Sequence, residues 1–254
     1  MLHQPTKPAV ATPWFKSWFD SPYYHQLYGN RTDEEASHFI NNLVNLLKPA
    51  AGATMLDVGC GSGRHCRQLA RKRFRVTGID LAASSIRKAQ KRQTGSLQFF
   101  RHDMRLPFGK NRFDYIFNFF TSFGYFKQSH ENEEVIANMA EALQPAGTLV
   151  FDYLNVAYAD ERLIETERKE IDGVVYNITR WTNNQFFYKK IEISDLIRGE
   201  SHEYTEQVSR FTLDDFRSML LPYNFTITRI FGDYNLEDYN TYSSPRLIII
   251  AKRS

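Results

Sequence analysis

The most informative run of this sequence is Met55-Leu56-Asp57-Val58-Gly59-Cys60-Gly61-Ser62-Gly63-Arg64-His65. Its apolar start leads into one acidic residue, three glycines follow on alternate positions, and a helix-compatible stretch continues to Arg73. This order predicts a strand, a tight turn and a helix. Glycines let the backbone of the turn approach a ligand closely, so the turn is a candidate binding element.

A second carboxylate follows the next apolar run. Residues 74–79 lead into Asp80, which stands 21 positions after Gly59. At the tip of a neighbouring strand, such a carboxylate is placed to accept hydrogen bonds from the two hydroxyls of a ribose. The two strand ends together predict a nucleoside-binding site.

The glycine spacing indicates which kind of nucleoside fits. The dinucleotide fingerprint G-x-G-x-x-G requires glycine at position 64, where this chain has Arg64. In addition, Asp57 stands two residues before the first glycine. A carboxylate there is poorly suited to a pyrophosphate, which is itself negative and favours bare N–H groups. It suits a ligand with a cationic end.

The run Leu56–Gly63 resembles the first motif of class I S-adenosylmethionine-dependent methyltransferases. The resemblance covers roughly residues 50–155 and 212–254. It implies S-adenosylmethionine as the cofactor and S-adenosylhomocysteine as the product. It also implies the fold of that class, a doubly wound, Rossmann-like α/β sheet of seven strands. The alternative is an ordinary glycine turn, which the carboxylates of Asp57 and Asp80 on either side disfavour.

The order of the elements along the chain agrees with this fold class. Apolar strands alternate with helical stripes up to Tyr153, which favours a parallel sheet with helices on both faces. From about residue 164 the pattern changes to two-residue alternation, which predicts an antiparallel β meander of three strands within about 164–211. We expect this meander to be an insertion in a methyltransferase core of residues 50–254. Residues 1–49 are expected to form a loose leader followed by a helical lid.

The resemblance implies cofactor contacts at the ends of successive strands and in the lid. By this resemblance, Asp103 and its neighbours contact the adenine and Asn118 contacts the methionine part. Lid residues contact the methionine carboxylate, because the negatively charged Asp57 cannot neutralise that group. For Asp103 the alternative is a turn cap, for Asn118 a turn residue, and for the lid aromatics plain packing. The residues expected to contact the cofactor are Asp57, Gly59, Gly61, Asp80, Leu81, Asp103, Met104, Asn118, Tyr24 and Arg31, with Tyr28 beside them.

The acceptor is less well defined by the sequence. Methyl transfer from a sulfonium is an in-line displacement with a neutral leaving group, so alignment suffices unless the nucleophile arrives protonated. No catalytic residue is therefore predicted. The resemblance implies a small-molecule acceptor methylated on N or O under the meander. The residues expected to contact the acceptor are Phe119, Ser122, Phe123, Tyr125 and Tyr153.

Two other functions stay open. An RNA or protein methyltransferase is the first, although the run Asn118-Phe119-Phe120-Thr121 departs from the Asn/Asp-Pro-Pro-aromatic motif of many enzymes that methylate adenine, cytosine or glutamine. The second is a non-catalytic protein that binds S-adenosylmethionine. The absence of an obvious base is the only feature that suggests it.

Composition narrows the class of protein. Charged residues make up 24% of the 254 residues, hydrophobic ones 42%, and the formal net charge is +3. These values are ordinary for a globular protein and give no support to nucleic-acid binding. No apolar stretch is long enough for a membrane span, and neither a metal site nor a disulfide framework is visible. The sequence therefore predicts a cytoplasmic protein without a metal and makes no prediction of its oligomeric state.

Overall fold

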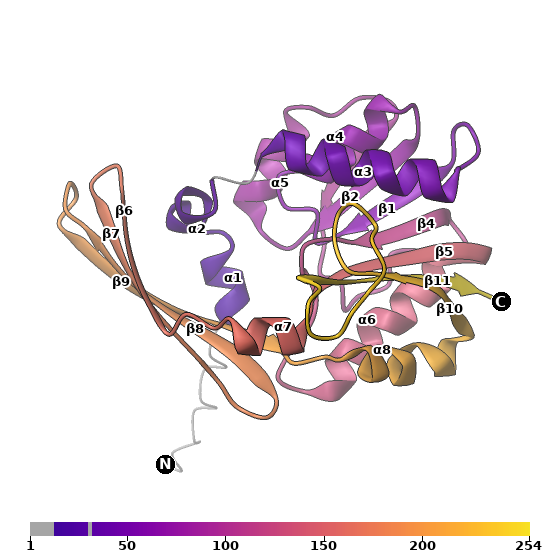
Figure 1. Cartoon of the computed structure of the whole chain (residues 1–254). Helices are drawn as coiled ribbons and strands as arrows, with labels where there is room; N and C mark the ends of the chain where they lie inside the picture. The colour runs from indigo at the N-terminus through magenta and orange to yellow at the C-terminus, as the bar shows by residue number, and fades with distance from the viewer. Residues whose placement is uncertain (1–12, 30–31) are drawn as a thin grey trace, which may run out of the picture.

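The computed structural model describes residues 13–29 and 32–254, so most of the predicted leader, as well as Arg31, lies outside the described residues. The core is a mixed sheet of seven strands in the order β10-β11-β5-β4-β1-β2-β3 (Figure 1). β1 to β5 are parallel, and β11 is antiparallel to both of its neighbours. This confirms the predicted doubly wound sheet. Its strands are β1 (Thr54–Val58), β2 (Arg75–Asp80), β3 (Leu97–Arg101), β4 (Phe113–Asn118), β5 (Leu143–Leu154), β10 (Phe225–Phe231) and β11 (Arg246–Arg253).

Helices cover both faces of the sheet, and β1 shows how the sequence directs this. Successive side chains of a strand point to opposite faces. Leu56 and Val58 accordingly pack with α6 and α8 on one face, whereas Met55 packs with α3, α4 and α5 on the other. Figure 1 shows these two helical layers above and below the sheet. The core helices are α3 (Asp33–Leu47), α4 (Arg64–Arg71), α5 (Ala83–Gln90), α6 (Ser129–Ala142), α7 (Val156–Glu161) and α8 (Leu213–Leu220), which is followed by the 3-10 turn η1 (Leu221–Tyr223).

The meander is a separate antiparallel sheet of four strands rather than the three that alternation predicts. The additional strand is β6 (Thr166–Ile171), whose residues Thr-Glu-Arg-Lys-Glu-Ile are mostly exposed and so give no apolar alternation to detect. The other strands are β7 (Val174–Thr182), β8 (Phe186–Asp195) and β9 (Glu200–Ser209).

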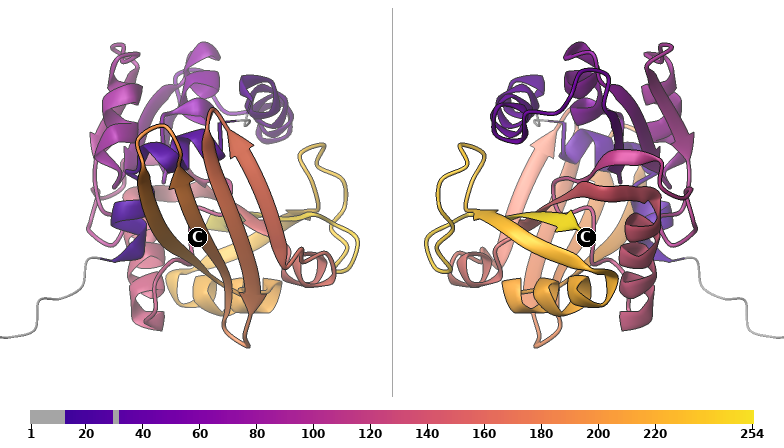
Figure 2. Two further views of the ribbon diagram at one scale, coloured as in Figure 1. Left: turned by 90° about the vertical axis from the view of Figure 1, so that its left-hand side faces the viewer. Right: turned by 90° about the vertical axis from the view of Figure 1, so that its right-hand side faces the viewer.

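The N-terminal aromatic segment forms two short helices, α1 (Trp14–Trp18) and α2 (Pro22–Leu27), which we call the lid. Figure 1 shows the lid between the meander and the core, and the left view of Figure 2 shows it behind the meander. Trp18 packs against apolar residues of β7 and β8, and its Nε1 donates to Glu206 Oε1 at 2.6 Å. Glu206 also accepts from Tyr28 Oη at 2.8 Å, just after α2. The meander therefore holds the lid over the carboxyl ends of the parallel strands.

Candidate functional site

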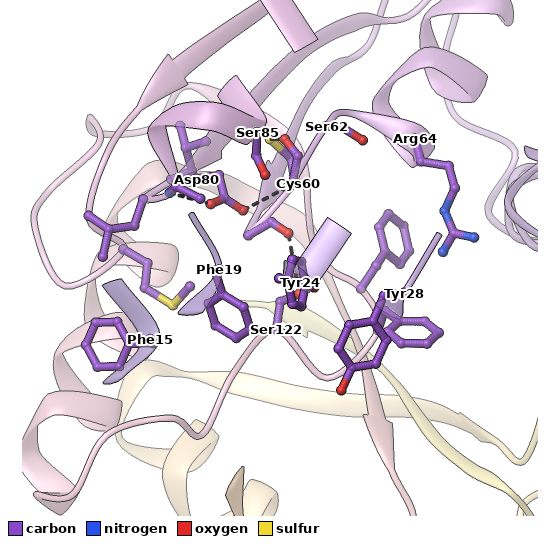
Figure 3. A pocket seen from close by; sticks show the side chains of 18 of the residues that line it. Phe15, Phe19, Tyr24, Tyr28, Cys60, Ser62, Arg64, Asp80, Ser85 and Ser122 are labelled. Carbon is purple, nitrogen blue, oxygen red and sulfur yellow. Dashed lines mark hydrogen bonds between the residues drawn. The ribbon is translucent and has the colours of Figure 1, made fainter. Parts of the chain in front are cut away.

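A cavity of about 380 Å³ lies at the carboxyl ends of β1, β2, β3 and β4, under the lid. This is where open α/β sheets bind ligands, and the volume lies within the usual range for a small-molecule site. Figure 3 shows Asp80 toward one end of it and Arg64 and Tyr28 toward the other. Of the predicted site residues, those that line the cavity are Tyr24, Tyr28, Gly59, Gly61, Asp80, Leu81, Asp103, Met104, Phe119, Ser122 and Tyr125.

The glycine turn forms the floor of this cavity. Gly59, Gly61 and Gly63 all have positive φ angles, of 78°, 55° and 79°, which glycine adopts without strain. A Cβ on Gly59 would lie 2.6 Å from Ser122 Cβ, so the turn is packed tightly on that side. A Cβ on Gly61 would meet nothing within 4 Å. The open side at Gly61 is therefore where a ligand can approach the backbone.

Asp80 braces the same turn from the tip of β2. Its Oδ2 accepts from Gly61 N and its Oδ1 from Ala82 N, both at 2.8 Å. Burial raises the pKa of Asp80, and these backbone donors act against that rise. Each carboxylate oxygen has a second lone pair, so both remain able to accept from a ribose hydroxyl.

Asp57 lies behind the turn rather than in the cavity wall, because β1 is buried on both faces. The side chain is 1% exposed; its Oδ2 accepts from Cys66 Sγ at 3.1 Å, and its Oδ1 has no partner among the described residues. Burial raises the pKa of Asp57 to about 7. A buried carboxylate oxygen without a partner is costly, which is consistent with a cationic donor that binds there.

Asp103 caps a turn, one of the two roles that the sequence left open, and it also lines the cavity. It lines the cavity beside Met104, and its Oδ1 also caps the local turn by accepting from Arg105 N at 3.1 Å. Arg105 holds the other oxygen at 2.6 Å and bridges to Glu131 at 2.7 Å. Partial burial raises the pKa of Asp103, but the hydrogen bonds from Arg105 outweigh it and leave the pKa below its usual value. The group is therefore a fixed, ionised acceptor.

Besides Asp57, three predicted contacts among the described residues do not line the cavity. Asn118 is fully buried, and its Nδ2 donates to Val58 O at 2.8 Å and Ser122 O at 3.1 Å, so it ties the end of β4 to the glycine turn. Phe123 packs in the core, 5.3 Å from the ring of Phe151. Tyr153 is also fully buried, and its Oη donates to Ser209 O at 2.7 Å. All three side chains are buried in the protein.

The structure adds cavity residues that sequence reasoning missed. Phe15 and Phe19 of the lid line the cavity, as do Arg64 and His65 at the start of α4. Arg64 is 14% exposed, donates to Thr32 O at 2.9 Å and lies 5.9 Å from the centre of the Phe120 ring. In the sequence, Arg64 stands out only because it replaces the third glycine of the dinucleotide fingerprint, and this does not indicate that its side chain lines the cavity.

The described residues contain no cluster of three or more His, Cys, Asp or Glu side chains that could hold a metal ion. Within that same part of the chain, no helix has the length and apolarity needed to cross a membrane.

Known proteins that are similar to this chain in sequence or in fold include methyltransferases. Residues 55–147 match the model of a methyltransferase domain family. A protein of Geobacillus sp. (strain WCH70) named as a methyltransferase is 23% identical over 91% of this chain and 97% of its own. Among solved structures, an S-adenosylmethionine-dependent methyltransferase from Clostridium acetobutylicum ATCC 824 has a TM-score of 0.76 at 16% identity, covering 91% of this chain and 96% of its own. The S-adenosylmethionine-bound amino pentose methyltransferase of Micromonospora echinaspora has a TM-score of 0.68 at 21% identity, covering 92% and 98%.

Proposed function

The chain carries a methyltransferase domain in residues 55–147 and is an S-adenosylmethionine-dependent enzyme, and we propose that it methylates an N or O atom of a small molecule. The observation that supports the cofactor site best is the pairing of Asp80 with the glycine turn. The Asp80 carboxylate faces the cavity beside Gly61, whose Cβ position is open. Asp103 and Met104 continue the wall on the adenine side.

The cofactor supplies a methyl group on a sulfonium, and the residues of this chain bind and orient it. With the cofactor bound, Asp80 would accept from the ribose hydroxyls, Asp103 would accept from the adenine amine, and Leu81 would pack on the adenine. The aromatic lid excludes water, which strengthens the attraction between the sulfonium and the acceptor atom. Transfer then needs the acceptor atom in line with the methyl–sulfur bond at about 3–3.5 Å.

We propose that the acceptor lies between the lid and the segment after β4. Phe119, Ser122 and Tyr125 form one wall there, and Tyr24 and Phe19 face it from the lid. Such a lining suits a compact acceptor that can pack against rings and make few hydrogen bonds. The Micromonospora protein is named as an amino pentose methyltransferase, so an amine of a small molecule is a candidate acceptor.

We also propose a cytoplasmic location and a division of the chain into a leader and lid, residues 1–49, and a core, residues 50–254, with the meander as an insertion. Cys60 and Cys66 are both free and buried, and free thiols persist in a reducing compartment.

Arg64 is our candidate for the methionine carboxylate at the end of the cavity away from Asp80. Arg64→Ala should weaken S-adenosylhomocysteine binding about tenfold, because one charge-assisted hydrogen bond of about 1.5 kcal/mol is lost. Isothermal titration calorimetry measures this. Arg67→Ala is the control: Arg67 lies on the same helix but bonds Asp33 at 2.8 Å, outside the cavity. Equal affinity of the Arg64 and Arg67 variants would argue against this contact.

Cofactor binding should also depend on pH through Asp57. With its pKa near 7 in the free protein, Asp57 is mostly protonated at pH 6 and mostly ionised at pH 8. The cofactor ammonium favours the ionised form, so affinity for S-adenosylhomocysteine should rise about tenfold between these pH values. Because burial also raises the pKa of Asp80, the Asp57→Asn variant identifies the group. That variant should bind weakly with a flat profile; a rise that survives in it would assign the effect elsewhere.

Calorimetric titration with S-adenosylhomocysteine, beside NAD, tests the cofactor. We expect micromolar binding of the first and none of NAD, and the reverse preference would overturn the proposal. An activity screen over small amines, phenols and hydroxy acids tests the acceptor. Tight cofactor binding with no methyl transfer in a broad screen would instead favour a non-catalytic binding protein.

One observation keeps RNA methylation as a second candidate. Between Gly59 and Arg112, fourteen residues are Lys or Arg and only two are acidic. Four exposed cations lie at the end of α5 and just after it, at Arg87, Lys88, Lys91 and Arg92. They form two like-charged pairs four residues apart, a spacing at which like charges repel on a helix surface. Helix-end cations explain part of this pattern. Titration of a labelled single-stranded RNA at 50 and 200 mM salt decides between the candidates, since only an RNA enzyme should show strong, salt-sensitive binding.

A further inference from the structure

Two residues at the cavity wall adopt a backbone conformation that their side chains disfavour. Phe120 and Thr121, which follow β4, have φ angles of 59° and 57°. The left-handed region costs about 1–2 kcal/mol for each residue other than glycine, and a β-branched threonine there is a marked exception. Strain of this kind persists only where the surroundings impose it.

Asp152, at the end of β5, imposes it through the backbone. Its Oδ2 accepts from Phe120 N at 2.8 Å, and its carbonyl oxygen accepts from Thr121 N at 2.8 Å. The side chain of Asp152 is fully buried. Two consecutive N–H groups are therefore fixed by one residue that lies more than thirty positions later in the chain.

Two further side chains hold Asp152 in place. Arg246, the first residue of β11, donates from Nε to Asp152 Oδ1 at 2.7 Å and from Nη2 to Thr121 Oγ1 at 3.0 Å. Tyr234, in the loop between β10 and β11, donates its hydroxyl to Asp152 Oδ2 at 3.0 Å. Its ring stacks on Phe39 of α3 at a centroid distance of 4.4 Å.

Arg246 and Tyr234 keep their protons near neutral pH. Burial lowers the pKa of Arg246, but the Asp152 carboxylate more than offsets this and the pKa lies above its ordinary value. Burial and the same carboxylate raise the pKa of Tyr234, so its hydroxyl stays a donor. Arg246 and Tyr234 therefore both remain hydrogen-bond donors to Asp152.

The strained segment is also pressed against the cofactor turn. Ser122, the next residue, packs so closely on Gly59 that no Cβ would fit there, and its Oγ donates to Gly59 O at 3.4 Å. Phe120 lies between two guanidinium groups, with Arg64 at 5.9 Å and Arg246 at 5.5 Å from its ring centre. One end of the cluster thus reaches the cavity wall on which Arg64 and Ser122 lie.

We propose that Asp152, Arg246 and Tyr234 are positioning residues for the methyl donor. They hold Phe120 and Thr121 in the left-handed conformation, with Ser122 against the glycine turn, so that the wall around the methionine part of the cofactor is formed before the cofactor binds. This inference rests on the proposed function. A preformed wall raises affinity because the segment is already ordered, so binding does not carry the entropy cost of ordering it.

The pair Tyr234→Phe and Tyr239→Phe tests this. Both tyrosines lie in the loop between β10 and β11, and each donates one hydroxyl hydrogen bond: Tyr234 to Asp152, and Tyr239 to Asn155 Oδ1 at 3.1 Å, away from the strained segment. Both variants should lose thermal stability to a similar, small extent. Only Tyr234→Phe should lose affinity for S-adenosylhomocysteine, by about fivefold to tenfold in calorimetric titration. Equal affinities, or equal losses, for the two variants overturn the inference.

Amide hydrogen exchange gives a second readout that does not depend on the ligand. The N–H groups of Phe120 and Thr121 should exchange at least tenfold faster in Tyr234→Phe than in the wild type, and at the wild-type rate in Tyr239→Phe. Unchanged exchange in Tyr234→Phe also contradicts the inference. If the wild-type protein itself does not bind S-adenosylhomocysteine, the proposed function fails instead, so the two failures are distinct.

Discussion

Asp80→Ala should weaken the binding of S-adenosylhomocysteine about 100-fold or more. The carboxylate is expected to accept two ribose hydrogen bonds, each charge-assisted and worth about 1.5 kcal/mol or more. A loss of about 3 kcal/mol corresponds to roughly a 100-fold rise in Kd. The substitution also removes the acceptor of Gly61 N at 2.8 Å, which braces the glycine turn. Calorimetric titration measures the change in Kd.

Asp114→Ala is the matched control for this effect. Asp114 is also an aspartate that accepts from backbone, at 2.8 Å from Thr54 N, but it lies at the opposite end of the strands from the cavity. This variant should lose stability and keep its affinity. If Asp80→Ala binds S-adenosylhomocysteine as tightly as Asp114→Ala does, the ribose site has been assigned to the wrong strand.

Asp152→Ala should lower the stability of the fold by about 3–5 kcal/mol. It leaves the Arg246 guanidinium, which is largely buried, without its partner at 2.7 Å, and an uncompensated buried charge is strongly destabilising. It also removes the acceptor of Phe120 N, whereas Thr121 N keeps its acceptor, the backbone oxygen of residue 152. For a chain of this size the loss corresponds to a decrease in Tm on the order of 10 °C, which differential scanning calorimetry detects.

An exposed ion pair provides the comparison. Asp214 bonds Arg217 at 2.7 Å, but its side chain is 86% exposed, and such pairs contribute little. Asp214→Ala should therefore shift Tm by only a degree or two. A double variant, Asp152→Leu with Arg246→Met, should regain part of the lost stability because neither charge remains buried. A wild-type Tm in Asp152→Ala would show that the pair contributes nothing to the fold.

Most of the core sheet could be predicted because its signals are local and periodic. The strands at residues 54–58 and 75–80 are apolar runs that end in a turn or a carboxylate, and the helices between them show apolar stripes. The strand β6 could not be predicted, since its exposed Thr-Glu-Arg-Lys-Glu-Ile run has no apolar face. It is a strand because its backbone pairs with β7.

The residues after β4 show where prediction of the site fails. The sequence assigned Ser122, Phe123 and Tyr125 to the acceptor together, but Ser122 and Tyr125 line the cavity and Phe123 is buried. The direction of each side chain depends on the left-handed turn at Phe120 and Thr121. Neither residue type favours that conformation, so no local pattern indicates it. Asn118 does not line the cavity for a related reason, since its side chain bonds Val58 and Ser122 in the same buried region.

The sequence by itself determined the methyl-donor half of this protein. Close backbone approach by Gly59–Gly63 and a carboxylate at the tip of the next strand are local features, so residue type and spacing are enough to specify them. Only the tertiary structure decided the other wall of the cavity. That wall depends on Asp152 and Arg246, which are 94 residues apart, and on a lid held by the meander. Contacts between such distant residues follow from how the layers pack, and a linear pattern does not contain that information.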